Sequence, residues 1–302
     1  MRARHYGMDW LRIGAFGLLI FYHIGMFFVH WDWHVKTARL MEGAAVPMLA
    51  TSAWRIPLLF IVSGYATAAL LERGTELARF VRDRSARLLI PLVFAMAVIV
   101  PPQPWVELMF KHGYLHGYLH FWWSGEDPTH ALVDDWGAHR VFLPMFLFGY
   151  LLRDAEAVWA GIRRWWKAAA LLALAGYAAV AAVEIAYPGR ARPPFELIVV
   201  FAAGRIVLGW CAIVALIGIA DRFWNRDHPW RATLTEAVFP FYIIHQTIIV
   251  LVGWWLLPLA FPPLAEFAIL APVTAAGCWL FYAVGRRVGW LRPLIGLRGR
   301  AA

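Results

Sequence analysis

Two ionisable residues, Arg12 and His23, stand in an otherwise apolar stretch near the start of the chain. A helix would place both side chains on one face, because their separation is about three turns, or roughly 16 Å along the axis. An imidazole that titrates near neutrality can accept a proton from a hydroxyl, and a guanidinium can hold an anion. Ionisable groups in a membrane-spanning helix usually face a protein interior or a wet cavity. The pair therefore predicts a proton-handling site with a cation near one end of the helix.

Each of these residues also has a more modest interpretation. Arg12 lies only one turn inside the apolar stretch, so its side chain would also reach the cytoplasmic headgroups or pair with Asp9. His23 lies deeper, where a histidine would also serve as a hydrogen-bonded structural residue. Its depth makes His23 the better candidate for chemistry.

A second basic pair, Arg84 and Arg87, opens a later apolar segment. Residues three apart point the same way on a helix. Guanidinium groups bind phosphates through two parallel hydrogen bonds, so the pair predicts an anion site for a phosphorylated ligand that arrives from the cytoplasm. The alternative is that these arginines only follow the positive-inside rule.

Further polar residues interrupt the apolar segments and would line a cavity. Tyr242 and His245 are one turn apart on one helix face, and His245 is a second intramembrane imidazole. Ser63 and Tyr65 flank a glycine, and such a small pair would equally form a notch where another helix packs. Arg55 precedes them and is expected to be buried by its position.

Three histidines, His112, His116 and His120, recur every four residues, a spacing that would align them on one helix. Such a row can bind a metal, but the neighbouring Tyr and Trp residues favour an amphipathic helix at the membrane interface. Cys211 and Cys278 lie inside apolar runs and form no metal motif or disulfide framework. No metal site is therefore predicted.

The composition places these residues in a membrane protein. Of the 302 residues 62% are hydrophobic, 16% are charged, and the mean hydropathy is +0.60, which excludes an ordinary soluble domain. Apolar segments close to the length that crosses a bilayer recur along the chain. We therefore predict an all-α, polytopic transmembrane helix bundle of about eight spans (eight to ten). The expected spans are 11–30, 47–71, 86–103, 139–152, 168–187, 196–220, 237–257 and 265–285.

The basic residues predict the topology. If the N-terminus is inside, most of the 28 Lys and Arg residues fall in segments on the inner side. This asymmetry predicts that both termini are cytoplasmic. It also explains the net charge of +9 without a nucleic-acid partner. The first apolar segment has no small-x-small cleavage site, and we expect it to be retained as a helix.

The whole chain, 1–302, is expected to form a single membrane-embedded domain. Its longest irregular stretch runs from Pro101 to His139 and is rich in His, Trp and acidic residues. We predict that 103–138 is an outer loop or a re-entrant region.

Several stretches resemble the membrane-bound acyltransferase-3 family in the order of that family's motifs. They are DWLRIGAFGLLIFYH, FIVSGY, RSARLLIP, FLFGYLL, EAVFPFYIIHQTIIV and WLRPLIG. The first matches an Arg-x10-His helix, the second a Phe-x-x-Ser-Gly-aromatic helix and the third an Arg-x-x-Arg-Leu-x-x-Pro entry. Within the family the chain is most similar to the glucan-succinylating (glucan biosynthesis protein C) branch.

The resemblance implies an acyltransferase that transfers groups other than amino-acyl groups. It would move an acyl group from cytoplasmic acyl-CoA, either acetyl-CoA or succinyl-CoA, to a hydroxyl of a glycan or lipid-linked acceptor of the cell envelope. The acyl-CoA would be a donor substrate, with no cofactor bound permanently. The protein would be a multi-pass protein of the inner (plasma) membrane, and a homodimer is one arrangement open to it.

The resemblance also implies roles for the residues above. His23 would be the general base or a transient acyl carrier. Arg12 would act beside it and, with Arg84 and Arg87, hold the phosphates of CoA. The substrate cavity would be lined by Ser63, Tyr65, Arg55, Tyr242 and His245.

The intramembrane cations leave other functions open. Arg55 and Arg205 would neutralise a carboxylate on the acyl group or stabilise the thioester oxyanion. A transporter or ion-conducting protein would instead line its path with Arg12, Arg55, Arg205, His23 and His245. The spans hold few carboxylates, which disfavours a proton relay. A catalytically silent homologue is a third hypothesis.

Overall fold

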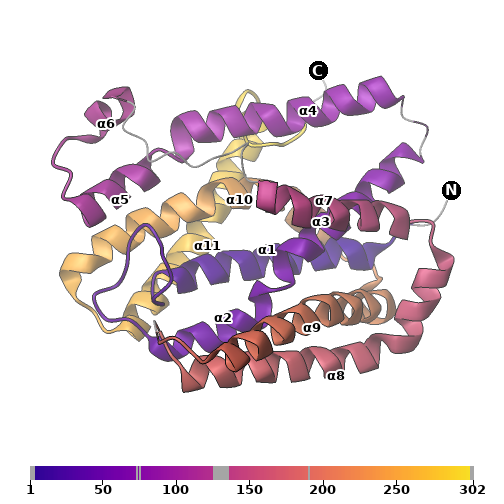
Figure 1. Ribbon diagram of the computed structural model, residues 1–302. Coiled ribbons are helices and arrows are strands. Elements are labelled where there is room, and N and C mark those ends of the chain that lie inside the picture. Colours follow the sequence, from indigo (N-terminus) through magenta and orange to yellow (C-terminus); the bar gives the residue numbers. More distant parts are fainter. Residues whose placement is uncertain (1–3, 73, 75, 125–135, 190, 300–302) are drawn as a thin grey trace. The chain divides into compact units, whose positions relative to one another are not determined.

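The computed structural model describes residues 4–72, 74, 76–124, 136–189 and 191–299, and all regular structure in these ranges is helical (Figure 1). This confirms the all-α prediction. The α-helices are α1 (Tyr6–Met26), α2 (Ala45–Ser52), α3 (Arg55–Leu71), α4 (Leu77–Phe94), α5 (Pro102–His112), α6 (Tyr118–Ser124), α7 (Trp136–Leu152), α8 (Glu156–Ala186), α9 (Phe195–Ile219), α10 (Pro229–Leu256), α11 (Pro263–Arg287) and α12 (Leu291–Leu294).

Five helical segments are long and apolar enough to cross a membrane, and a sixth is added if a bent pair forms one span. The bent pair is Leu77–Ile99 with Pro102–His112, which meet at an angle of 40°. Pro91 and a π-helical turn at Ala95–Ile99 precede this bend, and each weakens the regular hydrogen-bond ladder. The count of eight spans and the cytoplasmic termini stay predictions.

The helices extend further into polar sequence than the apolar runs indicated. α8 begins at Glu156 and α4 at Leu77, both before the predicted starts at 168 and 86. The added turns carry basic residues on an exposed side, which a helix tolerates at a membrane interface. The predicted span 47–71 is interrupted between α2 and α3, near Ala53 and Trp54.

The predicted loop or re-entrant region 103–138 contains helical structure. α5 (Pro102–His112) occupies its first part, and α6 (Tyr118–Ser124) ends at the last residue of the described stretch 76–124. Residues 125–135 lie outside the described ranges. The helix that follows, α7, begins at Trp136, so the region is less irregular than its sequence suggested.

Internal contacts divide the chain into two compact units. Unit 1 takes its described residues from Met1–Leu19, Glu42–Leu77 and Leu132–Thr235. Unit 2 takes them from Ile20–Met41, Ala78–Ala131 and Glu236–Ala302. α1 and α10 each contribute residues to both units, with His23 and His245 in unit 2.

Unit 1 is built on two close helix pairs, α3 with α7 and α8 with α9. In the first pair the backbones touch at two glycines. A Cβ atom added to Gly64 would overlap the Phe146 carbonyl oxygen, and one added to Gly149 would overlap the Ile61 carbonyl oxygen. Small residues at such crossings let helices in a bilayer gain van der Waals contact. The packing-notch interpretation of the Ser-Gly segment is therefore confirmed for Gly64.

Replacing Gly64 by alanine is expected to destabilise the protein by about 1–3 kcal/mol, because the new methyl group must push two backbones apart. The measurement is the midpoint of thermal unfolding in detergent, followed by tryptophan fluorescence. Gly17→Ala on α1 is the matched control, since a Cβ there meets no atom within 4 Å. Equal midpoints for the two variants would contradict the tight crossing.

Unit 2 has a separate apolar core that fixes the helices bearing the two histidines. Its buried residues come from the end of α1, from α5, α10 and α11, and from the segment after α1. Phe27 follows α1 directly and packs against Gly253 of α10 so closely that a Cβ on Gly253 would lie 2.9 Å from its ring. This core holds α1 and α10 together a few residues beyond His23 and His245.

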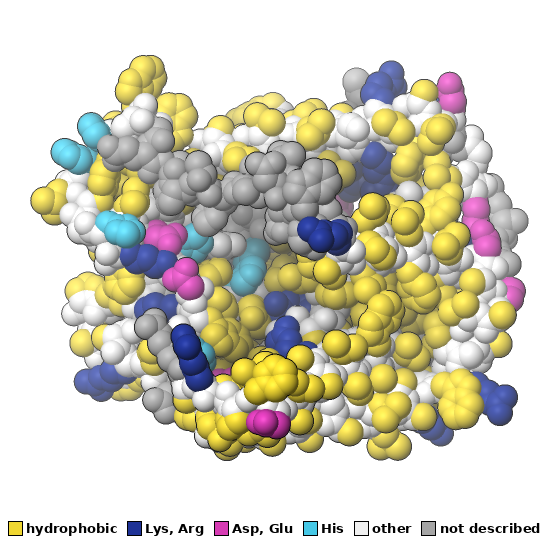
Figure 2. Space-filling view, viewed as in Figure 1, with side chains coloured by type: hydrophobic (Ala, Val, Ile, Leu, Met, Phe, Trp, Pro, Cys, Tyr) yellow, Lys and Arg dark blue, Asp and Glu magenta, His cyan; other side chains and the backbone are white. Residues whose placement is uncertain are grey.

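Large apolar side chains also cover much of the surface that Figure 2 shows. On α8 Leu171 is 69% exposed, and Leu280 of α11 is 64% exposed. Soluble proteins rarely expose contiguous apolar surface of this kind, whereas helices in a bilayer do. Together with the candidate spans, this surface marks a multi-pass membrane protein.

Candidate active site

The predicted catalytic histidine makes direct contact with a second histidine. His23 lies in the last turn of α1, and His245 lies within α10. His23 Nδ1 and His245 Nε2 are 2.7 Å apart, and the rings are nearly coplanar, with an interplanar angle of 4°. One hydrogen bond therefore joins the two imidazoles.

The backbone of α10 determines which nitrogen carries each proton. His245 Nδ1 lies 2.8 Å from the carbonyl oxygen of Tyr242 and 3.1 Å from that of Phe241. Carbonyl oxygens only accept hydrogen bonds, so His245 Nδ1 carries a proton. In the neutral ring Nε2 is then an acceptor, and His23 donates its Nδ1 proton to it. The basic nitrogen of His23 is consequently Nε2.

This pair can move a proton at a reacting hydroxyl. His245 is 1% exposed, while His23 is only partly buried. If His23 Nε2 takes up a proton, its Nδ1–H donates a charge-assisted hydrogen bond to His245, which stabilises the imidazolium. A base oriented by a buried partner is the arrangement used in nucleophilic and acid–base catalysis.

Aromatic and polar residues from a loop complete the surroundings of His23. Trp33 stacks on the His23 ring at a centroid distance of 5.2 Å. The next residue, His34, contacts Glu107 Oε2 through Nδ1 at 2.5 Å and accepts from the Gln246 amide at Nε2, 2.9 Å away. The loop after α1 is thus tied to α5 and to the residue beside His245. The sequence singled out none of these three contacts.

The network continues outward through Lys111. Its ammonium group donates to Glu107 Oε1 at 2.6 Å and to Asp32 Oδ1 at 2.8 Å. The hydrogen bond from Lys111 lowers the pKa of the exposed Asp32 below its usual value. Asp32 therefore stays ionised in mildly acidic medium, and the ion pair holds the loop that carries Trp33.

Lys36 closes the end of α1. Its ammonium group donates to the carbonyl oxygens of Met26 and Val29, both at 2.8 Å, and also contacts that of Trp31. A cation at the C-terminal end of a helix satisfies carbonyls that have no helical partner. Burial lowers the pKa of Lys36 to about 8, so the cap is charged at pH 7.

The predicted phosphate-binding arginines of α4 also lie in unit 2, beside the C-terminal segment. Arg87 Nε donates to the carbonyl oxygen of Gly296 at 3.1 Å. Arg298 lies close enough for its charge to act on Arg84. The two arginines thus belong to a wider basic group.

Arg12, predicted to share their role, lies in unit 1. Its Nη2 is 3.8 Å from Asp9 Oδ1, the partner that the sequence offered as the simple alternative. Asp9 is also bound by Arg4 at 2.7 Å and by the buried Arg231 at 3.0 Å. One carboxylate therefore serves three guanidinium groups.

The cavity residues predicted in unit 1 do not form one group. Tyr65 is buried, and its hydroxyl accepts a hydrogen bond from Arg153 at 2.8 Å, while Arg153 also pairs with Glu72 at 3.0 Å. Ser63, two residues before Tyr65, is exposed. The Tyr65–Arg153–Glu72 network is one that the sequence did not indicate.

Arg55 and Arg205 are held by adjacent hydroxyls. Arg55 is 3% exposed and its Nη1 donates to Thr51 Oγ1 at 3.2 Å. Arg205 Nη1 donates to Ser52 Oγ at 3.1 Å. The end of α2 thus links two cations that the sequence placed in separate spans. Tyr242, by contrast, is 49% exposed in unit 2.

The expected row of three histidines on one helix is wrong. α5 ends at His112 because Gly113 turns the chain with a left-handed φ of 63°, and His116 lies outside the helices. His116 and His120 stack at 4.5 Å instead. Within the described residues no group of three His, Cys, Asp or Glu side chains is placed to hold a metal ion.

A helical membrane protein with a buried, oriented histidine pair is suited to acyl or proton transfer at a hydroxyl. Comparison with known families identifies it further: the acyltransferase domain of the acyltransferase-3 family matches residues 5–106 and 98–283. The chain belongs to this family and is an acyltransferase. The match is in two parts that overlap at residues 98–106, where the region 103–138 begins. Neither the curated proteins nor the solved structures give a match.

Proposed function

We propose that this protein transfers an acyl group from cytoplasmic acyl-CoA to a hydroxyl of a glycan or lipid-linked acceptor at the inner membrane. Acetyl-CoA and succinyl-CoA are the donors in view, and the glucan-succinylating branch is the family branch that the motifs favour. The observation that carries the proposal is the hydrogen bond between His23 and His245, whose direction is set by the backbone of α10.

The transfer step uses His23 as a base. His23 Nε2 takes the proton of the acceptor hydroxyl while the hydroxyl oxygen attacks the thioester carbonyl carbon. The carbonyl then re-forms, the carbon–sulfur bond breaks and the new carbon–oxygen bond remains. The proton held on Nε2 passes to the departing CoA thiolate, so the enzyme returns to its starting state. In a variant of this step His23 Nε2 itself carries the acyl group between donor and acceptor.

The donor's phosphates would be held by arginines at the predicted cytoplasmic side. Arg84 and Arg87 of unit 2 would serve this role, and the family resemblance implies the same role for Arg12, which belongs to unit 1. Tyr242 and His245 of unit 2 are proposed for the walls of the substrate site, and the family resemblance implies the same role for Ser63, Tyr65 and Arg55 of unit 1. Arg55 and Arg205 would meet an acyl carboxylate such as that of a succinyl group, and their guanidinium groups donate to Thr51 and Ser52 at the end of α2.

The donor is tested by binding. Purified protein in nanodiscs is expected to bind acetyl-CoA or succinyl-CoA in isothermal titration calorimetry. The double variant Arg84→Ala/Arg87→Ala is expected to bind at least tenfold more weakly, because charge-assisted phosphate contacts are lost. The control is Arg79→Ala/Arg82→Ala, which removes the same charge from exposed positions of the same helix.

These outcomes decide the donor. A wild-type protein that binds neither CoA ester would overturn the proposal. Equal weakening in both double variants would show that net charge, and not the Arg84–Arg87 pair, governs binding.

A further inference from the structure

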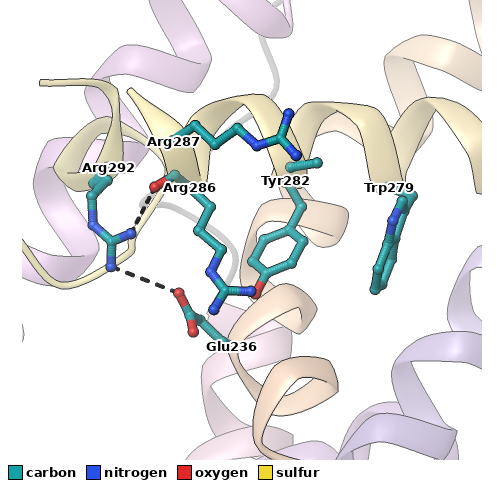
Figure 3. Close-up of a pocket in the computed structure, with 7 residues that line it drawn as sticks. Glu236, Trp279, Tyr282, Arg286, Arg287 and Arg292 are labelled. Atoms are coloured by element: carbon teal, nitrogen blue, oxygen red, sulfur yellow. Dashed lines mark hydrogen bonds and ion pairs between the residues drawn. The ribbon is translucent and has the colours of Figure 1, made fainter. Parts of the chain in front are cut away.

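A cavity of about 480 Å³ lies in unit 2 where α10, α11 and α12 meet. Such a volume is within the range of small-molecule sites. Figure 3 shows Glu236 of α10, Tyr282 and Arg286 of α11 and Arg292 of α12 pointing toward one another, with Trp279 on the same side of α11 and Arg287 lying along that helix. The lining residues are Glu236, Trp279, Tyr282, Ala283, Arg286, Arg287 and Arg292.

One wall of the cavity is strongly cationic. Three arginines line it, against the single carboxylate of Glu236. The Glu236 Oε1 atom is 3.8 Å from Arg292 Nη2, which is an ion pair but not a hydrogen bond. The wall therefore keeps an excess of positive charge and guanidinium donors, which is the chemistry that binds phosphate.

The fold holds Arg292 in place at this wall. Its Nη1 donates to the carbonyl oxygen of Arg286 at 2.9 Å, and its Nε donates to that of Arg298 at 2.7 Å (Figure 3 shows the first bond). Arginines that only set membrane topology have no need of such anchoring. A pre-oriented guanidinium loses less entropy when it binds an anion.

The other wall is aromatic. Trp279 and Tyr282 are three residues apart on α11, with ring centroids 5.7 Å apart. Tyr282 is 2% exposed and the Arg286 guanidinium lies beside it, whereas Trp279 is 40% exposed. An accessible indole provides a stacking surface for a planar base. Cationic and aromatic walls together fit a phosphorylated nucleotide.

The cavity also lies along the helix that carries the histidine pair. Glu236 and His245 are nine residues apart on α10, or about 13.5 Å along its axis. The carbonyl of Gly296, next to the cavity's α12 wall, accepts from Arg87 of α4. A ligand with its phosphates at the cavity and an extended arm along α10 would therefore reach toward His23.

We infer that this cavity binds the phosphorylated adenosine end of the acyl donor. The inference rests on the proposed function, since it takes acyl-CoA to be the donor. It adds Arg292, Arg287 and Trp279 to the residues that hold it. Arg292 lies in the WLRPLIG motif, whereas Arg287 and Trp279 lie outside the motifs. An anionic phospholipid headgroup shares the phosphate chemistry but lacks a base to stack on Trp279.

The test uses adenosine 3′,5′-bisphosphate, which has the base and phosphates but no thioester arm. Calorimetry on the full protein in phosphatidylcholine nanodiscs is expected to show binding. Arg287→Gln and Trp279→Leu, both at exposed positions, should each weaken it about tenfold, and Arg292→Gln at least as much. Arg164→Gln, an exposed arginine of α8, is the control and should bind as the wild type does.

Each outcome decides the inference. Unchanged binding in Arg287→Gln and Trp279→Leu would overturn it. If these variants instead lose phosphatidylglycerol from mixed nanodiscs while nucleotide binding persists, the site is a lipid site and the inference is wrong. Cavity-dependent nucleotide binding without any acyl transfer would uphold the site and refute the proposed function. Acyl transfer with an unchanged KM for acyl-CoA in all three variants would uphold the proposed function and refute the nucleotide site.

Discussion

Replacing His23 by alanine is expected to lower acyl transfer by about 10²–10⁴-fold, the usual contribution of a general base. In the proposed mechanism the imidazole supplies the Nε2 atom that takes the acceptor proton, and its loss also removes the hydrogen bond to His245 Nε2. Donor binding should change little, because the arginines proposed for the phosphates are untouched. The measurements are transfer of labelled acyl groups and calorimetric binding of the donor, both on protein in nanodiscs.

The control for this substitution is His112→Ala, an exposed histidine at the end of α5. It should transfer at the wild-type rate. Transfer that survives in His23→Ala would refute the role given to His23. The kinetics of the wild type also separate the two versions of that role, since an acyl-histidine intermediate gives ping-pong kinetics and a base acting on a ternary complex does not.

Sequence reasoning could identify the two histidines but not their pairing. Each stands out as an ionisable residue in an apolar run, which is a local property. Their hydrogen bond joins residues 222 positions apart and depends on how α1 and α10 pack. The direction of the bond depends further on the carbonyls of Phe241 and Tyr242, which no side-chain pattern encodes.

The contacts around His23 could not be predicted from the sequence for a related reason. Trp33 and His34 lie in a loop, where neither hydrophobic periodicity nor an apolar run predicts the position of a side chain. Glu107 lies in the stretch from Pro101 to His139 that the sequence marked as irregular, although Glu107 itself is in the helix α5. A glycine often ends a helix, and this rule would have predicted the end of α5 correctly. Gly113 has a positive φ, and it separates His112 from the other two histidines.

Two predicted cavity residues illustrate the limits of helix-face arguments. Tyr65 is the aromatic residue of the FIVSGY motif, yet its hydroxyl accepts a hydrogen bond from the buried Arg153. Gly64 in the same motif lies against the Phe146 carbonyl oxygen, and Gly149 of the α7 motif lies against the Ile61 carbonyl oxygen, where α3 and α7 cross closely. Part of the motif pattern therefore encodes packing within unit 1, while the histidines proposed to carry the chemistry belong to unit 2.

His245 is the second residue whose loss should be severe, and in the proposed mechanism it acts by orienting His23. Its Nε2 accepts the His23 Nδ1 proton, which fixes the tautomer and orients the ring. His245→Phe removes this acceptor, so kcat is expected to fall about 10–100-fold, the value of one hydrogen bond to a charged group. KM for the donor should stay near the wild-type value, because no phosphate contact is lost.

The conservative variant separates positioning from packing. In His245→Gln the side-chain oxygen can still accept from His23 Nδ1, so this variant should keep clearly more activity than His245→Phe. A residue that served only to fill the core would show the opposite order, since phenylalanine matches the ring and glutamine does not. Melting temperatures measured alongside kcat would reveal that case, because the loss of activity would then follow the loss of stability. Equal kcat values for the two variants and the wild type would refute the orienting role of His245, and would leave the tautomer of His23 to be set by groups other than α10.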